Sequence, residues 1–338
     1  MNKRILSFVS AFMLYGVFAV WLLLPHKNKL TGYENIFYAF PIIASLGVFM
    51  LTRRYAASFF AGLAGGAVYG FGSFACSFLC FHPFASLVYA FLPWSFLPAA
   101  FIYKYLTTGE KTTGFISACL SLLPFLFFIG CFAGAAHFYL FPIPTGSAIS
   151  AKNFVAILNP ARVSADSFSL GFYHAPLGAI AIGAVLFCKT RRYWIAILSA
   201  IAIFLCFYKP ILNIPPVLWL SFPVLICSVA IASGLEALIL SGKADSLWLL
   251  LAPAVLLLQA GLTILLGKGD DLSLSNSLSG VSVAAVMLIF FIARSGLSLR
   301  FLRVIILYAA VFLDIIVITR NLISAIFFSN LGLFLEVF

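Results

Sequence analysis

Side chains that could carry out acid–base chemistry or hold a phosphate are few in this chain and lie in short polar segments. Glu34 lies in the segment PHKNKLTGYEN, which also holds Lys27 and Lys29, and a later polar segment holds Arg162 and Asp166. A carboxylate can take a proton from a hydroxyl group, and a lysine or arginine can neutralise a phosphate. This mixture favours a site for an anionic substrate such as a lipid phosphate. Charged loop residues are also commonly solvated without any role in chemistry, and this alternative stays open.

The four histidines, His26, His82, His137 and His174, each lie beside an end of an apolar run. His82 separates two uncharged runs in the segment CFHPF, and the basic residues of the chain place all four histidines on the same outer side of a membrane. Their separation along the chain excludes a local zinc motif. We therefore take His82 and His174 as candidates for substrate binding and predict no cofactor and no metal ligands. A requirement for a divalent metal stays open.

Two acids lie inside apolar runs rather than in loops. Asp314, in AVFLDIIVITR, lies near the middle of its run, where an ionised group costs at least ~2.5 kcal/mol on insertion scales. It is either a functional group within the membrane or a partner in an interhelical hydrogen bond, and the sequence favours neither. Glu236, in ASGLEALILSGK, is within two turns of Lys243 and is expected to reach the inner surface.

The elements that must position these groups are membrane-spanning helices. Of the 338 residues, 64% are hydrophobic and only 9% are charged, whereas soluble domains carry about 25% charged residues. Apolar runs of roughly 20 residues, the length needed to cross the hydrocarbon, recur from end to end. Turn signals fall between the runs, so a helix bundle fits and a barrel does not. We predict an all-α, polytopic bundle that forms a single integral membrane domain over residues 1–338.

About 11–12 spans are expected. Eleven follow from the apolar runs, at residues 5–25, 35–52, 56–80, 84–103, 115–139, 170–188, 193–208, 216–240, 247–267, 277–293 and 303–319. The tail NLISAIFFSNLGLFLEVF is apolar but interrupted, and it fits a twelfth span, a re-entrant segment or an interfacial helix. The only long connection is the predicted outer loop at 141–169, and loops of that length are often functional.

Orientation follows from the basic residues, because cytoplasmic loops retain Lys and Arg. Paired or clustered basic residues occur at Arg53-Arg54, in CKTRRYW and in ARSGLSLRFLR. If the amino terminus is cytoplasmic, the predicted spans place all three of these turns on the cytoplasmic side. The net charge of +11 is then mainly a topology signal. The partners expected from it are the lipid bilayer and its anionic headgroups, not nucleic acid.

The third predicted span, 56–80, carries Gly62, Gly66 and Gly70 at intervals of four. Residues at this spacing share one helix face, so the glycines form a bare ridge along it. A ridge of this kind lets another helix backbone approach closely. The sequence therefore predicts that this span is buried within the bundle.

Three runs carry a family resemblance: FPIIASLGVFMLTRRYAASFFAGLAGGAVYGFGSFACSFLCFHPF, GFYHAPLGAIAIGAVLFCKTRRYW and LNIPPVLWLSFPVLICSVAIASGLEALI. They combine a span ending in basic residues, a small-residue span, a His-x-Pro helix with a basic turn, and a short outer segment before a further helix. In this order they resemble bacterial YfhO-like membrane proteins, of the multi-pass GT-C glycosyltransferase class. The resemblance implies a GT-C-like fold in a bacterial inner membrane, within the cell envelope.

The resemblance also implies an activity, the transfer of a sugar from a polyprenyl-phosphate donor at the outer face of the membrane. Glu34 would then be the catalytic base, with Asp166 the second catalytic candidate. The groups on the phosphate side would be Lys27, Lys29, His82 and Arg162, with His174 lining the same outer cavity.

The chain departs from the family pattern in ways that leave a second interpretation of its function open. Its first outer loop is short and has Glu34 as its only acid, and no Arg lies between Pro223 and Glu236. The large outer carboxy-terminal domain of the family has no counterpart. The alternative is a non-catalytic membrane protein: a transporter, a lipid-handling subunit or a scaffold within a larger complex. Asp314 favours it, because a transporter needs a polar pathway more than it needs loop groups.

Overall fold

The computed structural model describes residues 3–25, 34–53, 58–81, 83–98, 193–207, 216–242, 249–266, 272–296 and 299–328, together with parts of 119–134. Over these residues the chain is almost entirely helical and contains no strand, which confirms the all-α prediction. Four helical segments are long and apolar enough to cross a membrane: Ile5–Leu23, Phe59–Cys76, Leu218–Leu240 and Arg300–Arg320. These segments indicate an integral membrane protein. The predicted span 170–188 and the 141–169 loop lie outside the described residues, as does most of span 115–139.

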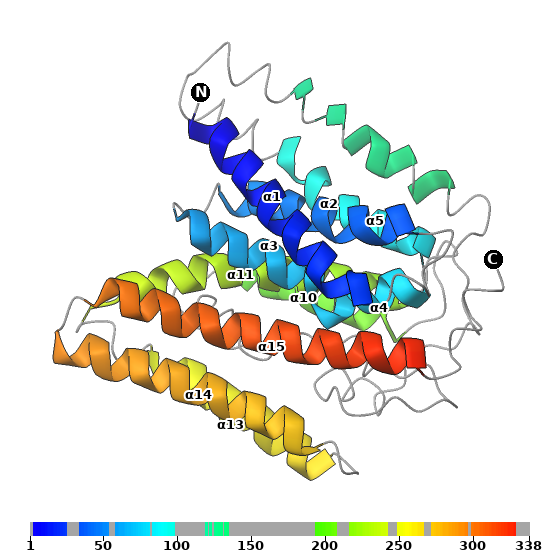
Figure 1. The fold of residues 1–338 in the computed structure, drawn as a ribbon. Helices are drawn as coiled ribbons and strands as arrows, with labels where there is room; N and C mark the ends of the chain where they lie inside the picture. The colour runs from blue at the N-terminus through cyan, green and yellow to red at the C-terminus, as the bar shows by residue number, and fades with distance from the viewer. Residues whose placement is uncertain are drawn as a thin grey trace.

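The described helices follow the predicted spans closely. They are α1 (Lys3–Leu23), α2 (Glu34–Thr52), α3 (Phe59–Phe71), α4 (Ser73–Phe81), α5 (Pro83–Ser95), α10 (Tyr193–Leu205), α11 (Ser221–Leu240), α13 (Leu251–Leu266), α14 (Leu272–Ser295) and α15 (Arg300–Phe328), with a 3₁₀ turn, η4 (Pro216–Leu220), before α11. Figure 1 shows their arrangement.

Two predicted spans differ from the structure. The third is not one straight helix, because the chain leaves helical geometry at Gly72, where ψ is 160°, and re-enters it at Ser73. The last span does not end at residue 319, because α15 continues to Phe328. The segment from Asn321 to Phe328 is therefore part of α15 and not a separate twelfth element. No charge, proline or glycine interrupts that segment, which is why the helix continues through it.

Helix α3 is the most enclosed candidate span, as the glycine ridge predicts. Of the window Phe59–Cys76, 83% is buried, against 22% for the span in α1. A Cβ atom built on Gly66 would lie 2.6 Å from the Ser45 carbonyl oxygen of α2, and one built on Gly65 would lie 2.7 Å from the Ser228 carbonyl oxygen of α11. Two neighbouring backbones thus approach α3 closely where it has no side chains. The prediction of a buried third span is confirmed.

Helices α1, α3 and α15 run in the same direction. Tyr15 of α1 donates a hydrogen bond to the Leu63 carbonyl oxygen at 2.9 Å, and one turn later Phe18 packs on Phe71 with ring centroids 4.6 Å apart. Helices α2 and α11 run antiparallel to α3. A Cβ atom on Gly62 would meet Thr52 and one on Gly70 would meet Pro41 of α2, while Ser58 and Gly65 meet Glu236 and Ser228 of α11. Helix α5 runs parallel to α2, since Tyr89 packs near Phe40 and, further along both helices, Trp94 donates to the Ile43 carbonyl oxygen at 3.0 Å. The directions of these helices alternate as the predicted topology requires.

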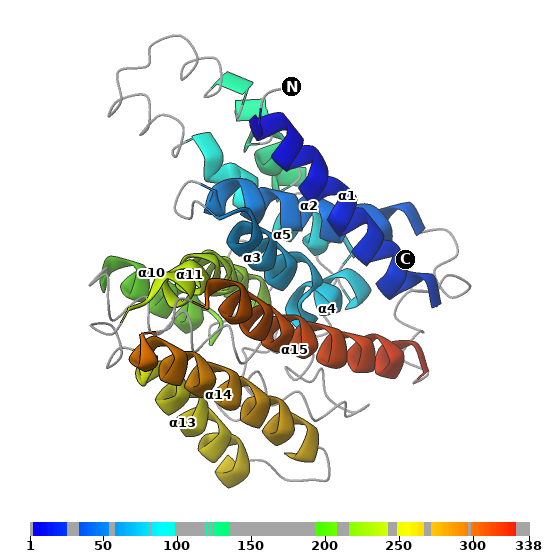
Figure 2. The same cartoon turned by 60° about the vertical axis from the view of Figure 1, so that its left-hand side comes forward.

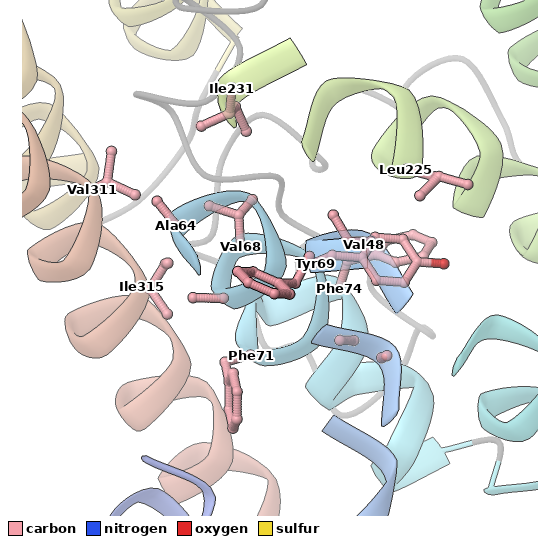
Figure 3. Packing of buried hydrophobic residues seen from close by; sticks show 14 of the residues in the cluster. Val48, Ala64, Val68, Tyr69, Phe71, Phe74, Leu225, Ile231, Val311 and Ile315 are labelled. Carbon is pink, nitrogen blue, oxygen red and sulfur yellow. The ribbon is translucent and has the colours of Figure 1, made fainter. Parts of the chain in front are cut away.

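The hydrophobic core surrounds α3 and takes residues from α2, α11 and α15 (Figure 3). Ala64, Val68 and Ile315 lie together on the α15 side, while Leu225 and Ile231 come from α11. The hairpin of α13 and α14 is peripheral by comparison. It reaches the rest of the bundle mainly through α15 (Figure 2). A separate small cluster of Ala252, Leu256 and Val286 joins its two helices.

Candidate functional site

Asp314 is a buried acid within a candidate membrane span. Its side chain is only 1% exposed, and it lies between Arg303 and Arg320 on α15. Those two arginines are separated by about 26 Å along the helix, close to the ~30 Å thickness of the hydrocarbon. Asp314 is about 16 Å along the helix from Arg303, which puts it well inside that layer. Asp314 and Glu236 are the two acids from the sequence analysis whose side chains lie among the described residues.

The helix that carries Asp314 is held in a fixed register against α3. Phe60 packs on Tyr308 with ring centroids 6.2 Å apart, and Thr319 donates a hydrogen bond to the Phe71 carbonyl oxygen at 2.9 Å. Both pairs are 248 residues apart in sequence, so the two parallel helices keep the same offset over three turns. This register fixes the depth of Asp314 relative to the glycine ridge of α3.

Hydroxyl groups bind the carbonyls next to the break at Gly72. Where a helix is interrupted, the last carbonyl oxygens lose their main-chain donors and need others. The Phe71 carbonyl oxygen accepts from Thr319, and the Tyr69 carbonyl oxygen accepts from the Tyr89 hydroxyl group at 2.8 Å. Tyr69 returns a bond of 2.8 Å to the Tyr89 carbonyl oxygen, and the two buried rings stack with centroids 4.2 Å apart. The break is therefore supported by side chains from α5 and α15.

One end of the bundle gathers arginines, and we call it the basic end. Here α2 and α11 end and α3 and α15 begin, and the described basic residues are Arg53, Arg294, Arg300 and Arg303. Figure 1 shows the end of α14 and the start of α15 together at its left. Basic residues from separate turns thus come to the same end, as the predicted topology requires. That this end faces the cytoplasm stays a prediction.

Arg303 binds the end of another helix. Its side chain is 5% exposed, and its Nη1 donates to the carbonyl oxygens of Ser241 at 2.7 Å and Ile239 at 3.3 Å. These carbonyls lie at the carboxyl end of α11, where the last groups of a helix lack intrahelical donors and carry partial negative charge. A buried guanidinium therefore ties the start of α15 to the end of α11.

Glu236, one turn earlier on α11, contacts the start of α3. Its Oε2 accepts a hydrogen bond from the Ser58 backbone N–H at 3.4 Å, and Ser58 is the N-cap residue of α3. A carboxylate is favourable at this end of a helix because of the partial positive charge there. Glu236 is half-buried in this position, so it contacts a neighbouring helix as well as lying near the surface.

The other predicted site residues fall at or beyond the limits of the described chain. Glu34 is the first residue of α2, whose direction places it at the end of the bundle opposite the basic end. Lys27, Lys29, His82, Arg162, Asp166 and His174 lie outside the described residues. A shared outer cavity for these groups therefore stays a prediction. Among the described residues, no group of three His, Cys, Asp or Glu side chains could hold a metal ion.

Sequence reasoning missed two features of this region. The tyrosine pair was not foreseen, although Tyr69 and Tyr89 each lie in an apolar run where a hydroxyl group needs a partner. The sequence marks Arg303 only as one of the clustered basic residues that indicate the topology. Its place one turn inside the last helix, after the exposed Arg300, is a pattern that could have indicated a buried cation.

Comparisons with known proteins add no relative to this description. No protein-family model, curated protein or solved structure matches the chain. The likeness to YfhO-like proteins and the GT-C class therefore stays a prediction from the quoted sequence runs.

Proposed function

We propose that this protein is a membrane carrier in which Asp314 binds a proton or a small cation during transport. The observation that supports this most is the burial of Asp314, at 1% exposure, within an apolar span. An acid at this depth costs at least ~2.5 kcal/mol on insertion scales, and such residues commonly belong to ion or proton pathways. A purely structural hydrogen bond could be made there by a neutral residue at lower cost.

The interrupted helix gives further support. Carriers often bind solutes or coupling ions at spanning helices that are broken. The α3–α4 break at Gly72 lies beside α15, and Thr319, just over one turn beyond Asp314, bonds the Phe71 carbonyl oxygen next to that break. In the register of the two helices, the break is level with Arg320, about 9 Å along α15 from Asp314, so the carboxylate and the break belong to one packed unit.

The test uses purified protein in proteoliposomes, with currents recorded on a solid-supported membrane while small cations, anions, amino acids and sugars are applied across a pH step. The wild type should give a solute-dependent or proton-dependent current that Asp314→Asn abolishes and Asp314→Glu partly retains. Glu236→Gln is the matched control, since it removes a charge of the same kind at the basic end and should keep the current. Equal currents in wild type and Asp314→Asn would remove Asp314 from the function.

The second candidate is the glycosyltransferase implied by the sequence resemblance, with Glu34 as the base. One observation favours it: α2 begins at Glu34, at the end of the bundle opposite the arginines, where the predicted outer loops would meet. In that case Glu34→Gln would abolish sugar transfer from a polyprenyl-phosphate donor while Asp314→Asn would not. The paired variants therefore separate the two functions in one set of preparations.

A further inference from the structure

Two exposed arginines and two exposed phenylalanines lie near the end of α14 and the start of α15. Arg294 lies in the last turn of α14 and Arg300 in the first turn of α15, and both side chains are exposed. Phe291, one turn before Arg294, is 57% exposed, and Phe301, next to Arg300, is 78% exposed. We call these four residues the turn patch. It combines fixed positive charge with apolar surface at one corner of the bundle.

Neighbouring residues fix the backbone on both sides of the patch. Gly296 takes a φ of 76°, a left-handed conformation that lets the chain reverse directly after α14. One turn into α15, Arg303 is anchored to the α11 carbonyls, with a bond of 2.7 Å to Ser241. The first turn of α15 is therefore fixed against α11, and Arg300 projects from a fixed backbone. A preorganised cation loses less entropy on binding than one on a mobile loop.

We propose that the turn patch binds an anionic phospholipid, with the headgroup phosphate on Arg294 and Arg300 and the acyl chain along Phe291 and Phe301. The arginines supply the planar donors that suit a phosphate group. The partial positive charge at the start of α15 adds to their attraction for an anion. The patch lies at the basic end, where an arginine-rich turn would meet the headgroup layer if the helices span the membrane.

The exposed rings distinguish a lipid from a soluble phosphate compound. A soluble anion would contact the guanidinium groups and leave Phe301 in water, at 78% exposure. An amphiphile can cover both parts, because its charged headgroup and its apolar chains belong to one molecule. An acidic protein segment would meet the charge but would need its own apolar residues to match the rings.

The experiment measures lipid binding to the purified chain in detergent by native mass spectrometry, with phosphatidylglycerol and phosphatidylcholine of identical acyl chains. The wild type should retain phosphatidylglycerol preferentially. The double variant Arg294→Gln/Arg300→Gln should bind it about 30-fold more weakly, since each basic residue near a lipid surface contributes roughly a fivefold change. Arg320→Gln is the matched control, because Arg320 is an exposed arginine near the other end of the same helix, and it should keep wild-type binding.

Three further arms decide between the occupants. Phe301→Ser should weaken phosphatidylglycerol binding while leaving the protein folded, and Arg294→Lys/Arg300→Lys should retain most of the binding because the charge is kept. Glycerol phosphate, which lacks the acyl chains, should neither compete with phosphatidylglycerol for binding nor stabilise the protein. Lipid preference unchanged in the glutamine double variant, an equal loss in Arg320→Gln, or effective competition by glycerol phosphate would each overturn the proposal. If the double variant does not fold, the wild-type preference for phosphatidylglycerol must still fall with added salt, and a salt-independent preference overturns it too.

Discussion

Helix α3 and the α13–α14 hairpin are both apolar, yet the structure uses them in opposite ways. Helix α3 is enclosed on several sides by α1, α2, α11 and α15, and its small residues allow backbones to approach it. The hairpin packs mainly on itself and on α15, and Leu258 and Leu265 of α13 are 65% and 81% exposed. Apolar composition therefore marks both as membrane segments, while the spacing of small residues distinguishes the centre of the bundle from its edge.

The largest effect should come from filling the glycine ridge. Gly66→Leu places a side chain where a Cβ alone would lie 2.6 Å from the Ser45 carbonyl oxygen, so the free energy of unfolding should fall by about 3 kcal/mol or more. Gly280→Leu in α14 is the control, because a Cβ there would meet no atom within 4 Å. Thermal unfolding in detergent measures both. Similar melting temperatures for the two variants would erase the distinction between centre and edge.

The next largest effect should come from the buried arginine at the basic end. Arg303→Gln removes the charged donor that bonds the Ser241 and Ile239 carbonyl oxygens, and the loss should be about 2 kcal/mol. Arg300→Gln, on the exposed side of the same turn, should change the unfolding free energy by less than about 0.5 kcal/mol in lipid-free detergent. If the two substitutions lower the unfolding free energy equally, Arg303 does not hold α15 against α11.

A smaller effect is expected at the tyrosine pair that joins α3 to α5. Tyr69→Phe and Tyr89→Phe each remove one bond of 2.8 Å to a backbone carbonyl, and each should cost about 0.6–1 kcal/mol. Because the two rings stack on one another, the loss of unfolding free energy in the double variant should differ from the sum of the two single losses. Tyr308→Phe is the control, since the buried Tyr308 hydroxyl makes no hydrogen bond to the described part of the chain, and that variant should not be destabilised.

The smallest effect should be found at the edge of the bundle. Leu265→Ala shortens a side chain that is 81% exposed, so it creates no cavity and should change stability in detergent by less than about 0.5 kcal/mol. Leu256→Ala, in the same helix but 0% exposed, should cost at least about 2 kcal/mol. A comparable loss at Leu265 would mean that a protein surface, rather than lipid or detergent, covers this face.

The sequence predicted the parts of the fold that follow from local patterns. The apolar runs predicted the helices, and the interval of four between Gly62, Gly66 and Gly70 predicted that the third span is buried. The break at Gly72 could not be predicted, since α3 carries other glycines that remain helical and the bonds from Tyr89 and Thr319 at the break come from other helices. The candidate site was harder still. Asp314 stood out because an acid is conspicuous in an apolar run, whereas the contacts of Arg303 depend on which helix end is its neighbour in space.

The long separation between α3 and α15 has a consequence for synthesis at the ribosome. The Thr319–Phe71 bond joins residues 248 positions apart, so α3 exists for about 12–50 s before α15 is made, at translation rates of 5–20 residues per second. During that time α1 and α2 can already cover the glycine ridge, but the side of α3 that receives α15 still lacks that helix. Assembly around α3 is therefore complete only after α15 has been translated. A truncated product that stops before Arg300 would leave the central helix open on that side.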